Sequence, residues 1–142
     1  MMTSLDDLIA LVDRALSPEF DLRAATRALG PIDRWIGELG IIEQVPEGLS
    51  GCVLETCVGT MSGLQVTFAS RLIVDEAELE RAFGPRVGWR PEADRFDGMR
   101  TLMFDVARAT GSGGVLVDAF PGPSAGELAL TAIVIRPQRR RR

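Results

Sequence analysis

The chain has 142 residues, 46% hydrophobic and 25% charged, a composition that fits one globular domain and excludes a disordered chain. It has 16 arginines, 20 acidic residues and neither histidine nor lysine, so it lacks the side chains that most acid–base, Schiff-base and metal-dependent hydrolases use. No apolar run reaches about 18 residues and the start, MMTSLDDL, has no basic region, so we expect a cytoplasmic protein with neither a membrane span nor a secretory signal.

Two helices are predicted near the N-terminus. Ser4 is a good N-cap for the first helix, in which Leu5, Leu8, Ile9 and Val12 recur at helical spacing up to Ser17-Pro18. Asp21 begins the second helix, which Gly30-Pro31 interrupts. Both are expected to pack an apolar stripe against the rest of the domain.

A third helix is predicted from Pro31, because proline suits the first helical position, to Gly40. Its apolar stripe would contain Ile32, Trp35, Ile36 and Leu39, which places Trp35 in the core. Whether residues 22–39 form two helices or one kinked helix stays open at this point. Residues 41–50 are expected to connect the helices to the sheet.

Five strands are predicted after residue 50, where apolar and polar residues alternate with a period of two. Their ranges are 52–58, 64–73, 99–108, 115–120 and 128–136. One further helix is expected between strands 2 and 3, because Asp75 can cap it, Glu78 completes a capping box and Gly84-Pro85 end it. The fold class predicted is therefore α+β, with N-terminal helices packed on a mainly antiparallel five-stranded sheet.

One domain is expected to cover residues 1–136, followed by a disordered Arg-rich tail at 137–142 that ends in Arg139–Arg142. The last strand is apolar on both faces, which is typical of a central strand or of a strand that faces a partner. The connector at 84–98 is long enough to indicate a functional or mobile loop.

Three short motifs are better explained by structure than by chemistry. Gly122–Gly126 matches G-x-S-x-G, but it lies between two predicted strands and no histidine is available as a base. Gly111–Gly114 precedes a strand rather than a helix, so it indicates a turn and not a phosphate cradle. Cys52 and Cys57 lie on opposite faces of a strand, so neither a disulfide nor a zinc site is expected. We expect no metal and no cofactor.

Asp105 and Asp118 are the best candidates for carboxylate chemistry, because they lie on neighbouring predicted strands. If the two met across the sheet, the pKa of one would be raised and the two could act as an acid–base pair. Exposure to solvent, or pairing with Arg71 or Arg100, is the competing interpretation.

The charge is unevenly distributed, since residues 1–135 contain 11 arginines and all 20 acidic residues, a formal −9. A surface of that sign repels nucleic acid and attracts basic partners. The predicted partner-binding residues are the helix carboxylates Glu76 and Glu80 and four residues of the long connector. Those four are Trp89, Arg90, Arg95 and Phe96.

Three functions remain open on sequence grounds. The first is a non-catalytic protein-binding module, most sharply an acidic inhibitor or immunity-type protein that neutralises a basic partner such as a bacterial toxin or effector. The second is a homo-oligomeric structural or adaptor protein, with a homodimer formed through the last strand. The third is a small-ligand sensor or an enzyme that uses carboxylates and arginine. No nucleic-acid or membrane partner is expected.

Overall fold

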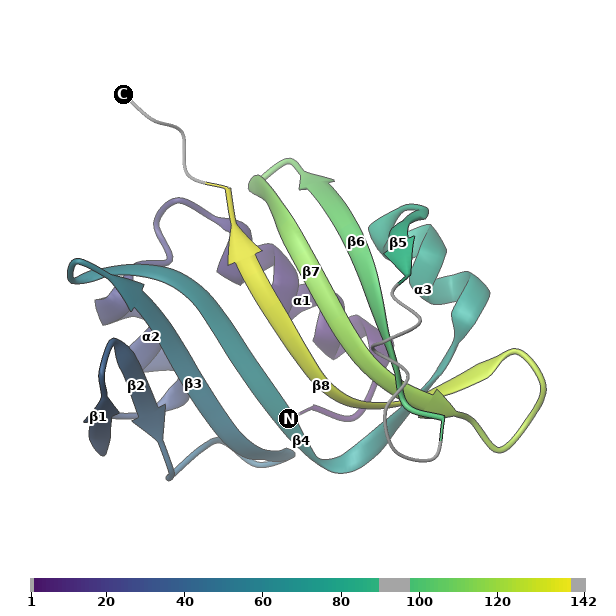
Figure 1. Ribbon diagram of the computed structural model, residues 1–142, viewed down its shortest axis with the longest axis horizontal. Coiled ribbons are helices and arrows are strands. Elements are labelled where there is room, and N and C mark those ends of the chain that lie inside the picture. The colour runs from purple at the N-terminus through teal and green to yellow at the C-terminus, as the bar shows by residue number, and fades with distance from the viewer. Residues whose placement is uncertain (1, 90–97, 139–142) are drawn as a thin grey trace.

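A computed structural model describes residues 2–89 and 98–138, with three helices and eight strands (Figure 1). The helices are α1 (Leu5–Leu16), α2 (Leu22–Leu29) and α3 (Glu76–Phe83). The strands are β1 (Arg34–Ile36), β2 (Leu39–Ile42), β3 (Leu49–Cys57), β4 (Thr60–Asp75), β5 (Arg86–Trp89), β6 (Arg100–Arg108), β7 (Gly111–Pro121) and β8 (Glu127–Pro137).

All eight strands belong to one antiparallel sheet with the order β1-β2-β3-β4-β8-β7-β6-β5. The sheet consists of two meanders of four strands, each preceded by helix, and the last strand of one meander pairs with the last strand of the other. The two halves are therefore joined through β4 and β8. Each half has its four strands in chain order from the edge of the sheet to its centre, so the two halves have the same topology. The pairing of β4 with β8 runs from Leu64–Ile135 to Asp75–Glu127 and is interrupted by one irregularity between Thr67 and Leu72.

The helices begin where their capping residues predict. The hydroxyl of Ser4 accepts a hydrogen bond from the Asp7 amide, and the Asp7 carboxylate accepts one in return from the Ser4 amide, which completes a capping box. The Asp21 carboxylate caps α2 by accepting from the Ala24 amide, and the Asp75 carboxylate caps α3 by accepting from the amides of Ala77 and Glu78. Three of the four predicted helix starts are thus confirmed, because local side-chain to backbone bonds decide them, whereas no helix begins at Pro31.

The core lies between the helices and one face of the sheet. Figure 1 shows the helices behind the sheet, and α1 contacts β4, β7 and β8, which are central strands of the sheet. The alternating residues of the strands that point to this side, such as Leu64, Val117 and Ile133, are buried. Phe83 of α3 meets Phe104 of β6 edge to face, with ring centroids 5.7 Å apart.

Arg108 links α1 and α3 to the sheet. Its Nε donates to the Asp13 carboxylate of α1 at 2.7 Å, and its Nη1 donates to the Ala82 carbonyl of α3 at 2.9 Å. One partly buried guanidinium at the end of β6 therefore fixes the ends of α1 and α3 relative to each other.

The predicted five-stranded sheet is wrong, because the described sheet has eight strands and α3 follows the fourth of them. The three additional strands come from segments that were expected to be a helix or connectors. β1 and β2 occupy the segment predicted as a third helix and the start of the connector after it. β5 occupies the beginning of the long connector, where Arg86 and Trp89 pair with Phe104 and Leu102.

The segment 31–42 forms a hairpin rather than a helix because its turn is fixed by Gly37, whose φ of +59° lies in the left-handed region. Ile36 pairs with Leu39 across this two-residue turn. The Ile32 side chain lies over Gly40, where a Cβ would meet it at 3.0 Å. The prediction that Trp35 is a core residue is also wrong, since Trp35 is 50% exposed on the edge strand β1. Apolar residues at 32, 35, 36 and 39 fit a short hairpin as well as a helix, and β-branched isoleucines favour the hairpin.

Other sequence expectations are confirmed. The last strand is central, between β4 and β7, as one of the two interpretations of its apolar faces predicted. Cys52 is buried, Cys57 is exposed, and both are free thiols. The G-x-S-x-G segment lies in the turn between β7 and β8, where the Gly122 amide donates to the Glu127 carbonyl at 2.8 Å. The tail predicted to be disordered at 137–142 stays a prediction for 139–142, which lie outside the described residues, whereas Pro137 ends β8 and the Gln138 amide donates to the Ser112 carbonyl.

The glycines at the start of β7 allow the end of α1 to approach the sheet. A Cβ on Gly113 would lie 2.5 Å from the Arg136 carbonyl oxygen and 2.8 Å from Cδ2 of Leu16. A Cβ on Gly111 would collide with the Leu16 carbonyl. The glycine-rich segment thus serves close packing between helix and strand.

We predict that Gly113→Ala lowers the free energy of unfolding by about 1–3 kcal/mol, because the added methyl group overlaps backbone atoms that cannot move independently. Gly114→Ala is the matched control, since nothing lies within 4 Å of a Cβ there, and its effect should stay within about 0.5 kcal/mol. Urea unfolding of the two variants measures the difference. Equal stabilities would contradict the role assigned to Gly113.

Candidate functional site

The face of the sheet opposite the helices is uncovered within the part of the chain that the structure describes. A line of side chains crosses this face from β2 to β6, and every neighbouring pair in it is a register pair. We call it the apolar row, which consists of Ile41, Val53, Gln65, Val134, Leu116 and Met103. All six side chains are only half-buried. Five large apolar side chains in one line on an open sheet face form a surface that is suited to contact with another protein.

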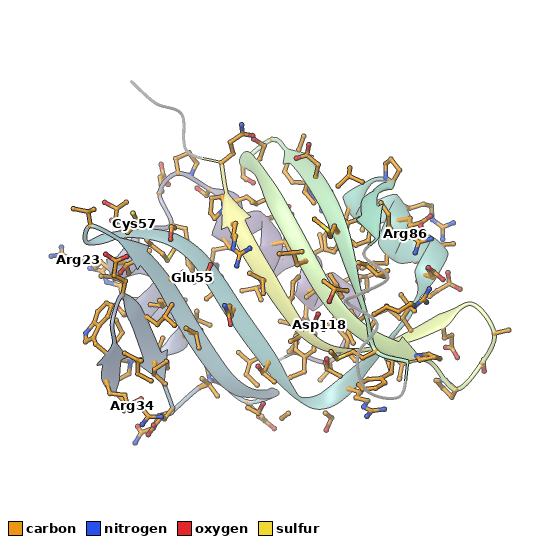
Figure 2. The ribbon with its side chains drawn as sticks, viewed as in Figure 1. Arg23, Arg34, Glu55, Cys57, Arg86 and Asp118 are labelled. Carbon is orange, nitrogen blue, oxygen red and sulfur yellow. The ribbon has the colours of Figure 1, made fainter. Side chains whose placement is uncertain are left out.

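A charged cluster lies beside the apolar row, near the middle of the sheet (Figure 2). Arg136 of β8 donates to the Glu55 carboxylate of β3 from Nε at 3.1 Å and from Nη2 at 3.3 Å. Gln65 of β4 donates to the same carboxylate at 2.9 Å. The pair lies over Gly63, where a Cβ would collide with Glu55. The absence of a side chain at Gly63 therefore lets two strands that are not neighbours exchange a bidentate ion pair.

The charges of this cluster are set by its hydrogen bonds. The bond from Arg136 holds the pKa of Glu55 below its ordinary value and outweighs the opposing effect of desolvation. The bond to Glu55 in turn raises the pKa of Arg136. Both groups stay ionised near neutral pH, and half of the Arg136 side chain remains exposed beyond the pair.

A second polar line borders the apolar row on its other side. Thr101 of β6 donates to the Asp118 carboxylate of β7 at 2.7 Å, and Thr131 of β8 donates to the Asp118 carbonyl at 3.3 Å. Farther along the same face, the guanidinium of Arg71 lies 4.2 Å from the ring centroid of Phe120. The open face therefore has an apolar centre and polar borders, the arrangement that is usual in protein interfaces.

Asp105 and Asp118 do not meet across the sheet. In the register of β6 and β7, Asp105 faces Gly114 while Asp118 faces Thr101. The two carboxylates are thus separated by four residues along the strands, or about 13 Å. Asp118 pairs with Thr101 rather than with either arginine considered from the sequence, and Arg71 contacts Phe120 instead. The geometry required for an acid–base pair is not formed.

Three of the predicted partner-binding residues lie in α3 and in the edge strand β5, and the other three lie outside the described residues. Glu76 and Glu80 both contact Arg86 of β5, at 3.5 and 3.2 Å, so their charges are partly compensated. Trp89 belongs to β5 by its backbone. Arg90, Arg95 and Phe96 lie outside the described residues.

The sequence interpretation missed the apolar row and the exposed hairpin β1–β2. Trp35, Ile36 and Leu39 of this hairpin are 50, 56 and 38% exposed, and Leu39 pairs with Glu55 on the open face. The available signal was the presence of large apolar residues, such as Val53 and Leu116, at positions where a strand with one wet face usually has polar ones.

The helical side of the molecule has a shallow depression of about 600 Å³ between α1, α2 and Thr110. Asp13, Arg14, Glu19 and Arg27 border it, so its rim contains charges of both signs. Asp13 is already engaged by Arg108. This arrangement has no convergent set of groups that would select one ligand.

Within residues 2–89 and 98–138, no three or more cysteine, aspartate or glutamate side chains gather as metal ligands. No helix in the described ranges is both long and apolar enough to cross a bilayer. In comparisons with known proteins, no family model, curated protein or solved structure matches the chain.

We predict that Glu55→Gln lowers the free energy of unfolding at pH 7 by about 1 kcal/mol or less, since Arg136 is half exposed and the pair is partly screened. The pKa of Glu55 is depressed below its ordinary 4.5 in the folded protein, so the stabilisation is complete above that pH and is lost as the pH falls through the folded-state value. The difference between wild type and variant should therefore disappear at an acidic pH below the folded-state pKa of Glu55.

Denaturant unfolding at the two pH values measures this effect. Glu43→Gln is the control, because Glu43 and Arg34 are paired at 3.3 Å with both side chains more than half exposed, and we expect no measurable change there. A difference for Glu55→Gln that persists unchanged at low pH would contradict the assignment.

Proposed function

We propose that this protein is a non-catalytic protein-binding module that docks a partner on the open face of its sheet. The observation that carries the proposal is the apolar row, whose large side chains Val134, Leu116 and Met103 are half-buried on the open face of strands whose other face is buried. An isolated apolar side chain on a surface needs no explanation, but a continuous line across six strands marks an interaction surface.

The charge of the chain favours a basic partner. Residues 1–135 carry a formal −9, and Asp105 and Asp118 border the apolar row without an arginine partner among the described ion pairs. Opposite net charge accelerates association and makes it sensitive to salt. The narrower form of the proposal, an inhibitor or immunity-type protein that neutralises a toxin or effector, rests on small size and acidic charge alone.

A homo-oligomeric module is the second candidate. It is favoured by β8, because the outward residues Ala132 and Val134 of this central strand are as apolar as those that face the core. The proposals of an enzyme or a small-ligand sensor receive no such support, since Asp105 and Asp118 are far apart in the register and the depression between α1 and α2 has no convergent polar groups.

We predict that Leu116→Glu weakens capture of a basic partner by about tenfold or more, because it places a charge in the middle of the apolar row. Val58→Glu is the matched control, since Val58 is 89% exposed in the turn between β3 and β4. The tagged protein and both variants are incubated with lysate of the native host at about 0.1 M salt, and bound proteins are identified by mass spectrometry.

Each candidate is then purified and titrated against the three proteins. The proposal expects one basic protein that binds wild type and Val58→Glu, loses affinity with Leu116→Glu and loses affinity as salt rises towards about 1 M. Equal binding by Leu116→Glu, or a low-salt capture that yields no basic protein, would overturn it. A parallel Glu80→Gln variant tests the helix carboxylate predicted from sequence, since loss of binding there would move the site to α3.

A further inference from the structure

The open face is large enough to be an interface between two copies of the chain. Six strands, from β2 to β6 in sheet order, and three lines of side chains cover about 29 by 20 Å at ordinary strand spacing and rise. Two such faces would bury about 1,200 Å² together, which exceeds the roughly 1,000 Å² that a specific interface requires.

Two polar lines frame the apolar row, and their side chains differ in size in a regular way. The Arg136 line contains Glu55, Gly63, Arg136, Gly114 and Asp105. The Asp118 line contains Gly51, Thr67, Ala132, Asp118 and Thr101. On β3, β4, β8 and β7, a large side chain in one line corresponds to a smaller one in the other, while Asp105 and Thr101 on β6 are similar in size.

A twofold axis along the apolar row brings the two lines of opposite copies together. Each residue of the row then meets its own counterpart, so Leu116 packs on the partner copy's Leu116. The Arg136 line of one copy lies over the Asp118 line of the other, which places Glu55 over Gly51, Arg136 over Ala132 and Gly114 over Asp118. Large side chains face small ones at each of these positions, as interdigitated sheet packing requires.

The same axis also matches charge. Ala132 and Asp118 are register partners on β8 and β7, so Arg136, placed over Ala132 of the other copy, lies next to its Asp118. Symmetry gives two such contacts, and the exposed half of Arg136 beyond Glu55 is available for them. An axis along the strands is less favourable, because it would place Asp105 against the apolar Leu39.

We propose that a second copy of this chain covers the open face, so that the free protein is a homodimer with two aligned sheets packed face to face. The inference shares its surface with the proposed function, and a basic partner would have to displace the second copy. The two copies carry like net charge, so the dimer, unlike the partner complex, should not weaken as salt rises.

The test is the mass of the purified protein by light scattering and sedimentation over a range of concentrations. We expect about twice 15.4 kDa for wild type and for Val58→Glu, and 15.4 kDa for Leu116→Glu and Ala132→Arg. Ala132→Arg introduces like charges against Arg136 of the other copy, and thermal unfolding shows whether each variant is folded. A wild type that stays monomeric at high concentration, or folded Leu116→Glu and Ala132→Arg variants that both remain dimeric, would overturn the proposal.

Two further variants test the direction of the axis. Asp118→Asn keeps the bond from Thr101 but removes the charge, and should raise the dimer dissociation constant about threefold to tenfold. Asp105→Asn should leave it unchanged, whereas an axis along the strands, which places Asp105 against Leu39, predicts a lower dissociation constant for Asp105→Asn and no change for Asp118→Asn. A monomeric wild type with partner capture that Leu116→Glu abolishes rejects the dimer and keeps the proposed function. A dimer with capture that Leu116→Glu does not affect keeps the dimer and rejects the proposed docking site.

Discussion

The pairing of β4 with β8 is the interaction on which the rest of the structure depends. Among the described residues it is the only backbone strand pairing between the two meanders, and it contains pairs such as Leu64 with Ile135 that are far apart in the sequence. The centre of the sheet is consequently fixed from both sides by long-range hydrogen bonds. α1 packs on this same centre, so the helical layer and the strand pairing stabilise each other.

The two faces of the sheet differ in how their side chains are packed. The helix side is dry and closely packed, to the point that Gly113 has no space for a methyl group. The open side places its ion pair, Glu55 with Arg136, directly over Gly63 and beside the apolar row. A polar pair fixed in this position gives the surface a defined shape and orientation, and specific recognition depends on such features more than on apolar area.

Local features of the fold could be predicted from the sequence and distant ones could not. The caps Ser4, Asp21 and Asp75 determine helix starts within three or four residues, and these predictions are confirmed. The hairpin β1–β2 was missed because its apolar spacing also fits a helix, and tertiary pairing with β3 decided between the two. The candidate site could not be predicted, since the apolar row takes its members from strands whose order and register appear only in the folded sheet. A single strand shows at most one outward leucine or valine, as at Leu116.

The position of β8 also constrains when the protein can fold. This central strand is synthesised after both of its neighbours, β4 and β7. The β4 edge of the first meander therefore stays unpaired until β8, the last strand of the second meander, has been synthesised. Chains with such non-local pairing fold slowly, and their unpaired strand edges, which are prone to aggregation, stay exposed until folding is complete. The first meander, with β4 at its open edge, is the part of the nascent chain for which a chaperone would matter most.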